Sequence, residues 1–289
     1  PLPVEEGDFV RRIAAPGWLA AGTRADGIVR VVNHGTDHGS LGLLGVDAPL
    51  YAKFGYSTAT SPLLAGRSAE ERPDQSVAIV VDGVAADRSG FTTDALELLA
   101  CDDGSSAGWA VSTSITHRVT DRAEHPDHGT PWAGGIVESG PRVTTASLVR
   151  GTWEVRFVRV DRHDGDRLRG DGLRVSGWPV SGDHVRSDTS VGTATAVAAE
   201  VVSGIRSLAG FDASGVQADL DATFLGARTG TPWLMAPMPA DTSWHIAAIG
   251  LARDALGSAP TAAFEGDGAT VHVVWDDDAH ISVTLPEAG

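Results

Sequence analysis

Short stretches of alternating apolar and polar residues recur along most of this chain. They are rich in Val, Ile, Thr and Trp, a composition typical of β-strands. The clearest alternation lies in residues 153–160, WEVRFVRV, with one break in phase between Phe157 and Val158. The stretches that predict strands are residues 17–24, 27–35, 51–58, 76–83, 96–103, 109–120, 142–161, 173–181, 194–210, 218–228, 231–238, 242–252, 269–277 and 280–285.

Asp-Gly turn signals separate many of these stretches, in VDG, CDDG, HDGD, GDG and EGDG. Residues 269–285 predict a hairpin with an acidic tip. About fourteen expected strands with almost no helix indicate an all-β fold, a large antiparallel β-sandwich, or super-sandwich. Residues 121–135 and 161–172 break the strand pattern and predict long loops, which often carry sites.

Composition limits the classes of partner. A formal net charge of −16 argues against nucleic acid. No apolar run reaches the roughly 20 residues that would span a bilayer, so no membrane is expected. The single cysteine, Cys101, excludes an intramolecular disulfide and a metal-binding cysteine pair.

Domain organisation is expected to be simple. Residues 1–8 are rich in proline and acidic residues and predict an interdomain linker, while residues 9–289 predict a single β-sandwich domain. No signal peptide is visible, so a cytoplasmic location is expected. The chain starts at PLPVEE without methionine, which indicates a native N-terminus further upstream.

Rare residue types gather in residues 26–62. This window holds the only asparagine (Asn33), the only lysine (Lys53) and both tyrosines (Tyr51 and Tyr56) of the chain. Elsewhere arginine replaces lysine, as a GC-rich codon bias would favour. Their survival together suggests that specific side-chain chemistry is needed here, although chance clustering in a strand pair would look the same.

The segment NHGTDH supplies the first candidate site. Asn33, His34, Asp37 and His38 offer two imidazoles and a carboxylate, which suit a His–Asp acid/base pair or a metal site. One turn rarely supplies enough metal ligands, so we expect no metal and no cofactor. Polar residues lining a substrate cleft are favoured, and a glycine-rich turn whose side chains cap the backbone stays open as an alternative.

Two further segments carry candidate residues. In YAKFGYST, Lys53 and Tyr56 would share a strand face only if a bulge at Gly55 shifted the register, and Ser57 follows them. A core tyrosine and a lysine that extends its ammonium group to solvent are the alternative. In EHPDHGTPW, Trp132 beside a proline could stack on a sugar ring, or belong to a solvated loop.

The motifs VVNHGTDHGSLG and LYAKFGYSTATSP resemble the C-terminal domain of a bacterial family, domain-of-unknown-function family 2264. The resemblance covers the whole chain and implies a two-part protein, with a helical toroid first and a β-sandwich after it. That architecture is shared with heparinase-like polysaccharide lyases and with some uronic-acid-directed glycoside hydrolases. It implies a partner, the N-terminal toroid of the same polypeptide, and an oligo- or polysaccharide substrate.

The resulting hypothesis is a C-terminal β-sandwich that walls the substrate cleft of a carbohydrate-active enzyme, either a hydrolase or a lyase. By that resemblance the acid/base groups usually lie on the toroid, and Asn33, His34, Lys53 and Tyr56 contribute to a site between the two parts. From their chemistry, His34, Lys53 and Tyr56 are the candidate catalytic residues, and Asn33, Asp37, His38, Ser57 and Trp132 the candidate substrate contacts. Two alternatives remain: a non-catalytic carbohydrate-binding or structural module, and a metal-dependent sandwich enzyme that uses His34, Asp37 and His38.

Overall fold

The computed structural model describes the backbone of strands in the first half of the chain and nearly all of it from residue 136 onward. The described residues are 10–15, 18–25, 28–33, 40–45, 77–81, 84–85, 87–90, 96–100, 106–112, 116–119, 136–177, 180–181, 186–190, 193–198, 201–219, 229–253, 255–266 and 268–285. Side chains are described at 77–81, at nearly all of 139–177, at most of 202–212 and 232–285, and at scattered positions between.

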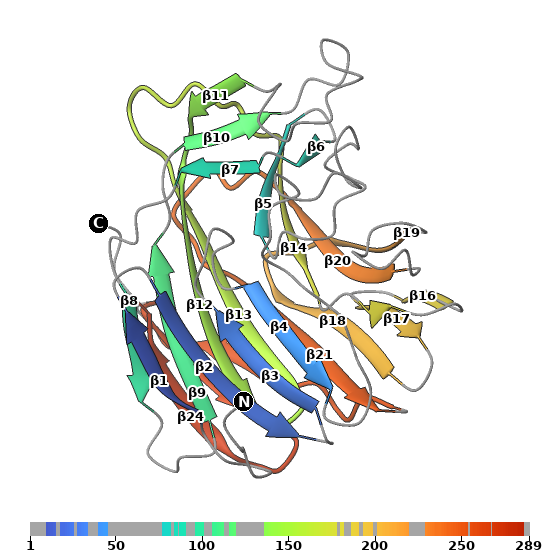
Figure 1. Ribbon diagram of the computed structural model, residues 1–289. Helices are drawn as coiled ribbons and strands as arrows, with labels where there is room; N and C mark the ends of the chain where they lie inside the picture. The colour runs from blue at the N-terminus through green and yellow to red at the C-terminus, as the bar shows by residue number, and fades with distance from the viewer. Residues whose placement is uncertain are drawn as a thin grey trace.

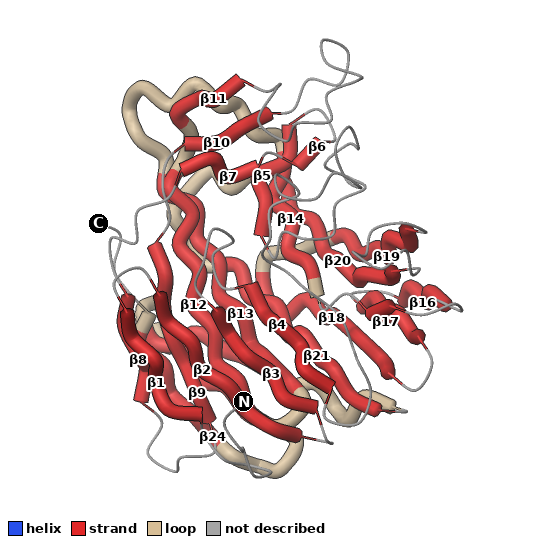
Figure 2. Tube along the Cα trace, in the orientation of Figure 1, coloured by secondary structure: helices blue, strands red, loops and turns tan. Residues whose placement is uncertain are grey.

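The all-β prediction is confirmed. The described residues form 24 strands in five sheets, and every strand pairing is antiparallel. Figure 2 shows strands and loops, and no helix, in this part of the chain. Within this part of the chain no helix is long and apolar enough to cross a lipid bilayer.

An eight-stranded sheet forms the middle layer of the molecule (Figure 1). Its strands, in spatial order, are β16 (Arg186–Ser190), β17 (Thr193–Ala198), β18 (Val201–Ala209), β21 (His245–Arg253), β13 (Trp153–Asp161), β12 (Arg142–Arg150), β9 (Ser106–Ser112) and β8 (Leu96–Ala100). Strands distant in sequence, such as β13 and β21, are therefore neighbours.

Four smaller sheets surround this layer. A four-stranded sheet comprises β1 (Val10–Ala15), β2 (Trp18–Ala25), β3 (Ile28–Asn33) and β4 (Ser40–Gly45), and its strand β2 contacts β9. A six-stranded sheet comprises β15 (Val180–Ser181), β20 (Thr229–Pro237), β14 (Gly172–Ser176), β5 (Val77–Val81), β6 (Val84–Ala85) and β19 (Ala213–Asp219), and its strand β20 contacts β17 and β18. The three-stranded sheets are β11 (Ile136–Ser139), β10 (Thr116–Val119) and β7 (Asp87–Gly90), and β22 (Thr261–Phe264), β23 (Thr270–Val274) and β24 (His280–Thr284).

A tight hairpin joins β12 to β13 at the centre of the molecule. Nine consecutive residue pairs link the two strands without a register shift, from Arg142–Asp161 to Arg150–Trp153. The two-residue connection starts with Gly151 at φ +54°, a backbone conformation that side chains other than glycine rarely adopt. This turn holds two nine-residue strands of the middle layer in a fixed register.

Strand β13 is buried on both faces, which explains the break in its alternation. All nine of its residues are buried, and its pairing with β12 is continuous. Trp153, Val155 and Phe157 lie on one face, and Val158 and Val160 on the other, since alternate residues of a strand share a face. The phase break thus marks a strand between two layers and not a bulge.

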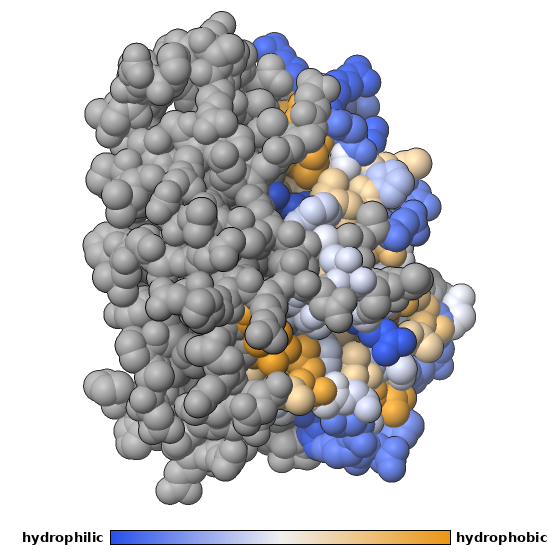
Figure 3. Space-filling view, turned by 90° about the vertical axis from the view of Figure 1, so that its right-hand side faces the viewer, coloured by the Kyte–Doolittle hydropathy of each residue, from blue (hydrophilic) through white to orange (hydrophobic). Residues whose placement is uncertain are grey.

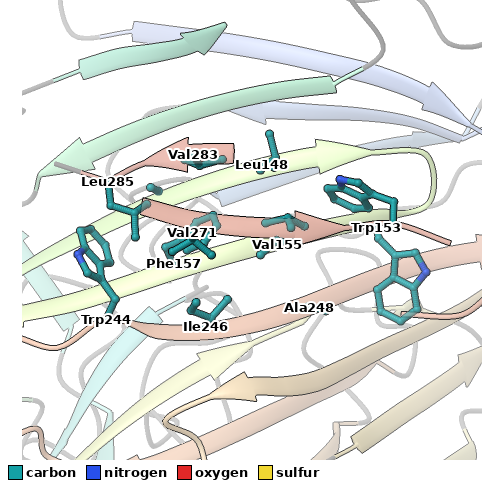
Figure 4. Close-up of a cluster of buried hydrophobic side chains, with 13 residues drawn as sticks. Leu148, Trp153, Val155, Phe157, Trp244, Ile246, Ala248, Val271, Val283 and Leu285 are labelled. Atoms are coloured by element: carbon teal, nitrogen blue, oxygen red, sulfur yellow. The ribbon is translucent and has the colours of Figure 1, made fainter. Parts of the chain in front are cut away.

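The C-terminal sheet covers one face of the middle layer. Val271 and Val273 of β23 pack with Val155 and Phe157 of β13 in a buried apolar cluster (Figure 4). Burial of such side chains stabilises the fold by about 1.5–3 kcal/mol each. The predicted hairpin with an acidic tip is confirmed as β23 and β24, joined through Asp276, Asp277 and Asp278.

Candidate functional site

The predicted site residues lie largely outside the described part of the chain. Asn33 ends β3 and pairs with Ser40, the first residue of β4. His34, Asp37 and His38 fall in the segment between these paired strands, outside the described residues. Lys53, Tyr56, Ser57 and Trp132 lie outside them as well. Their roles therefore stay predictions.

A buried ionic network lies near the start of β13, beside the turn that joins it to β12. Glu154 accepts hydrogen bonds from the Arg156 guanidinium at 2.8 and 3.0 Å and from the Ser147 hydroxyl at 2.7 Å. The guanidinium also donates to the backbone carbonyl of Ser176 in β14, at 3.1 Å. This bond from β13 to β14 joins the eight-stranded sheet to the six-stranded sheet. Both charged side chains of the network are almost fully buried. The network leaves Glu154 engaged and unsuited to proton transfer.

A second buried ion pair lies at the other end of β13 and on its opposite face. The Arg159 guanidinium donates to both carboxylate oxygens of Asp161, at 2.9 and 3.1 Å. It also lies 4.7 Å from the ring centroid of Trp244, a cation–π contact. This pair closes the apolar cluster at the edge where β13 ends and β21 begins.

His245 is the buried histidine of this edge. Its ring makes an edge-to-face contact with Phe211, and it lies so close to Gly210 (φ +80°) that a side chain there would collide with it. Burial lowers the pKa of His245, while the backbone of Ser243 and the carboxylates of Asp241 and Asp212 act in the opposite direction. His245 is 7% exposed, so little of its surface reaches solvent.

The loop between β13 and β14, residues 162–171, lies at the same edge; we call it the arginine loop. The sequence predicted a long charged loop here, and the structure shows it anchored to its neighbours. The backbone N–H groups of Arg167 and Leu168 both donate to the carbonyl of Ser139, at 2.8 and 2.9 Å. The N–H of Asp171 donates to the carbonyl of Val80, and that of Met238 to the carbonyl of Asp171.

No group of three or more potential metal ligands is present among the described residues. The arrangement there can hold sheets together and can present charge at an edge of the sandwich. Sequence reasoning missed the two ion pairs on β13. The signal was available in the spacing: Glu154 and Arg156, and Arg159 and Asp161, each stand two apart in a strand whose other positions are apolar.

No protein-family model and no curated protein sequence matches this chain, so membership of family 2264 stays a prediction. Solved structures match it. The heparan sulfate lyase HepC from Pedobacter heparinus aligns over 97% of this chain and 43% of its own, with a TM-score of 0.58 and 10% identity. A heparinase III structure aligns over 96% of this chain and 42% of its own, with a TM-score of 0.58 and 9% identity. The chain thus shares a heparinase-like sandwich fold and spans less than half the length of these lyases.

Proposed function

We propose that this chain is the β-sandwich part of a polysaccharide lyase that acts on a uronic-acid-containing glycan. The observation that carries the proposal is the extent of the fold match, which takes in nearly the whole chain but only 43% of a heparan sulfate lyase. The lengths support a companion domain elsewhere in the same polypeptide. In that arrangement the sandwich walls the cleft beside the companion domain.

The reaction would be a β-elimination. A base removes the proton next to the uronate carboxylate, the bond to the glycosidic oxygen breaks, and an acid protonates the departing oxygen. A cation or hydrogen-bond donors at the carboxylate stabilise the charge that develops there. Within the proposal, His34 and Tyr56 are the candidate proton-transfer groups and Lys53 the candidate partner of the carboxylate.

The test uses the full polypeptide that contains this chain, incubated with heparan sulfate and with other uronate polysaccharides. Absorbance of the unsaturated uronate and the release of reducing ends are followed together. A lyase raises both signals in step, whereas a hydrolase raises reducing ends alone. Lys53→Ala and Tyr56→Phe are expected to lower the absorbance signal at least tenfold, by the usual size of acid–base and electrostatic contributions.

The same turnover assay distinguishes the lyase from the binding module and from the metal-dependent enzyme. Unchanged turnover in both variants would leave this chain a scaffold or binding module and move the chemistry to the companion domain. Cleavage that requires a tightly bound divalent metal, lost on treatment with a chelator, would favour the metal-dependent enzyme. Release of reducing ends without absorbance would overturn the lyase proposal.

A further inference from the structure

Two sets of arginines contrast among the described residues. Arg150, Arg156 and Arg159 each form an ion pair with a carboxylate, at 2.6 to 2.9 Å. The side chains of Arg162, Arg167 and Arg169 in the arginine loop are exposed, and none forms an ion pair with another described residue. Residues 162–171 hold these three arginines beside three aspartates, Asp164, Asp166 and Asp171, so the arginine loop is close to neutral in a chain with a net charge of −16.

The backbone of the loop is held in place before any ligand arrives. Leu168, in its middle, is buried at 5% exposure, and the Ser139 carbonyl accepts two N–H groups beside it. The Ser139 hydroxyl donates to the carbonyl of Gly165 at 3.0 Å. A loop fixed in this way loses little further backbone entropy on binding.

The same contacts fix the backbone that carries the three exposed arginines. A turn at residues 163–166 is closed by the N–H of Asp166 donating to the His163 carbonyl, and by the N–H of His163 donating to the Asp166 carboxylate. Arg162 and Arg167 therefore flank one tight turn. Leu168 is buried, while its two neighbours Arg167 and Arg169 are exposed.

Acidic side chains are interspersed in the loop. The Asp166 carboxylate accepts a hydrogen bond from the His163 N–H, whereas Asp164 at the tip of the turn and Asp171 at the end of the loop are exposed. Hydrophilic residues gather at the upper and lower margins of the described surface, with apolar patches between them (Figure 3). The exposed carboxylate of Asp164 would repel an anionic ligand, so its removal should strengthen the binding of such a ligand.

We propose that the arginine loop binds the sulfate and carboxylate groups of an acidic polysaccharide, through residues other than the candidates His34, Lys53 and Tyr56. Guanidinium groups match both anions because their planar fork donates two parallel hydrogen bonds. The inference rests on the proposed function, because that function supplies the glycan. To that function the inference adds the three arginines that would bind the polysaccharide at this edge of the sandwich.

The test measures binding of the 289-residue chain to immobilised heparan sulfate, with uncharged dextran as the control surface. Wild type is expected to bind heparan sulfate and not dextran, more weakly as salt is raised. The combined substitution Arg162→Ala, Arg167→Ala and Arg169→Ala is expected to weaken binding about tenfold, from three exposed charge contacts. Asp164→Asn is expected to strengthen binding, since it removes the opposing charge. Arg206→Ala, at an exposed arginine of β18, is the matched control and is expected to leave binding unchanged.

Equal binding by wild type and the triple variant would overturn the inference, and so would an absence of wild-type binding. A fall of the same size in Arg206→Ala would show non-specific attraction to basic residues and would overturn it too. None of these results bears on the lyase proposal, which is judged by the unsaturated product in the turnover assay. Conversely, binding that depends on the loop, in a protein without lyase activity, would retain the contact site and reject the proposed reaction.

Discussion

At the scale of single residues, the four charged side chains of β13 form two ion pairs because residues two apart in a strand lie on the same face. Glu154 and Arg156 share one face and Arg159 and Asp161 the other, so each ion pair forms within one strand. Both pairs are buried, where breaking a pair leaves an uncompensated charge. Their role in the fold is therefore much larger than that of an exposed ion pair.

Glu154→Gln is expected to lower the free energy of unfolding by about 3–5 kcal/mol, because it leaves the Arg156 guanidinium buried without a counter-charge. Denaturant unfolding followed by tryptophan fluorescence measures the change. The exposed pair supplies the contrast. Asp277→Asn breaks the contact with Arg150, where Asp277 is 52% exposed, and should cost less than about 1 kcal/mol.

The double variant Glu154→Leu and Arg156→Met separates charge from packing. Replacing both charges with apolar side chains of similar size is expected to recover most of the loss, since no unpaired charge remains. A double variant as unstable as the single one would mean that the Ser147 and Ser176 contacts, and not charge balance, dominate.

His245 is expected to make stability depend on pH. Burial lowers its pKa in the folded state, so the unfolded chain takes up a proton first as the pH falls through about 6.5. The free energy of unfolding should therefore decrease below that pH, until the lower folded-state pKa is reached. His245→Gln should remove this contribution, measured as denaturation midpoints between about pH 8 and pH 5.

The matched control for this test is His280→Gln, at an exposed histidine of β24. It is expected to keep the wild-type dependence on pH. A His245 variant that follows the wild-type curve throughout would show that other groups cause the acid sensitivity.

At the scale of elements, the sequence predicted strands where apolar and polar side chains alternate and missed several others, both apolar ones such as β4 (SLGLLG) and polar ones. The C-terminal hairpin and the long strands β12 and β13 follow from their pattern. Strands β7 (DRSG) and β16 (RSDTS) are too polar to be identified in this way. Their backbones pair with β10 and β17, partners that a local pattern does not reveal.

The C-terminal sheet is expected to be essential for the middle layer. Trp275→Ala should lower the free energy of unfolding by about 3–5 kcal/mol, because this side chain is buried in the cluster with Phe157 and Val271. Phe264→Ala, in the edge strand β22, should cost much less because Phe264 is 40% exposed. Thermal or denaturant unfolding compares the two, and equal losses would contradict the packing described here.

At the scale of the whole molecule, the all-β class and the antiparallel sandwich were predictable, because alternation and Asp-Gly turns recur throughout the chain. The stacking of sheets was not, since it depends on strands far apart in sequence, such as β13 beside β21. The candidate site was predicted from rare residue types around Asn33 and Lys53. Residue chemistry alone does not show which elements bring such residues together.

The central claim is that this chain belongs to a lyase, and the most direct test is the fate of solvent oxygen during cleavage. The full polypeptide is incubated with heparan sulfate in water enriched in heavy oxygen, and the products are analysed by mass spectrometry. Elimination adds no water, so a lyase is expected to give unlabelled products with an unsaturated uronate at the new non-reducing end. Products that carry heavy oxygen and no unsaturation would identify a hydrolase and contradict the claim.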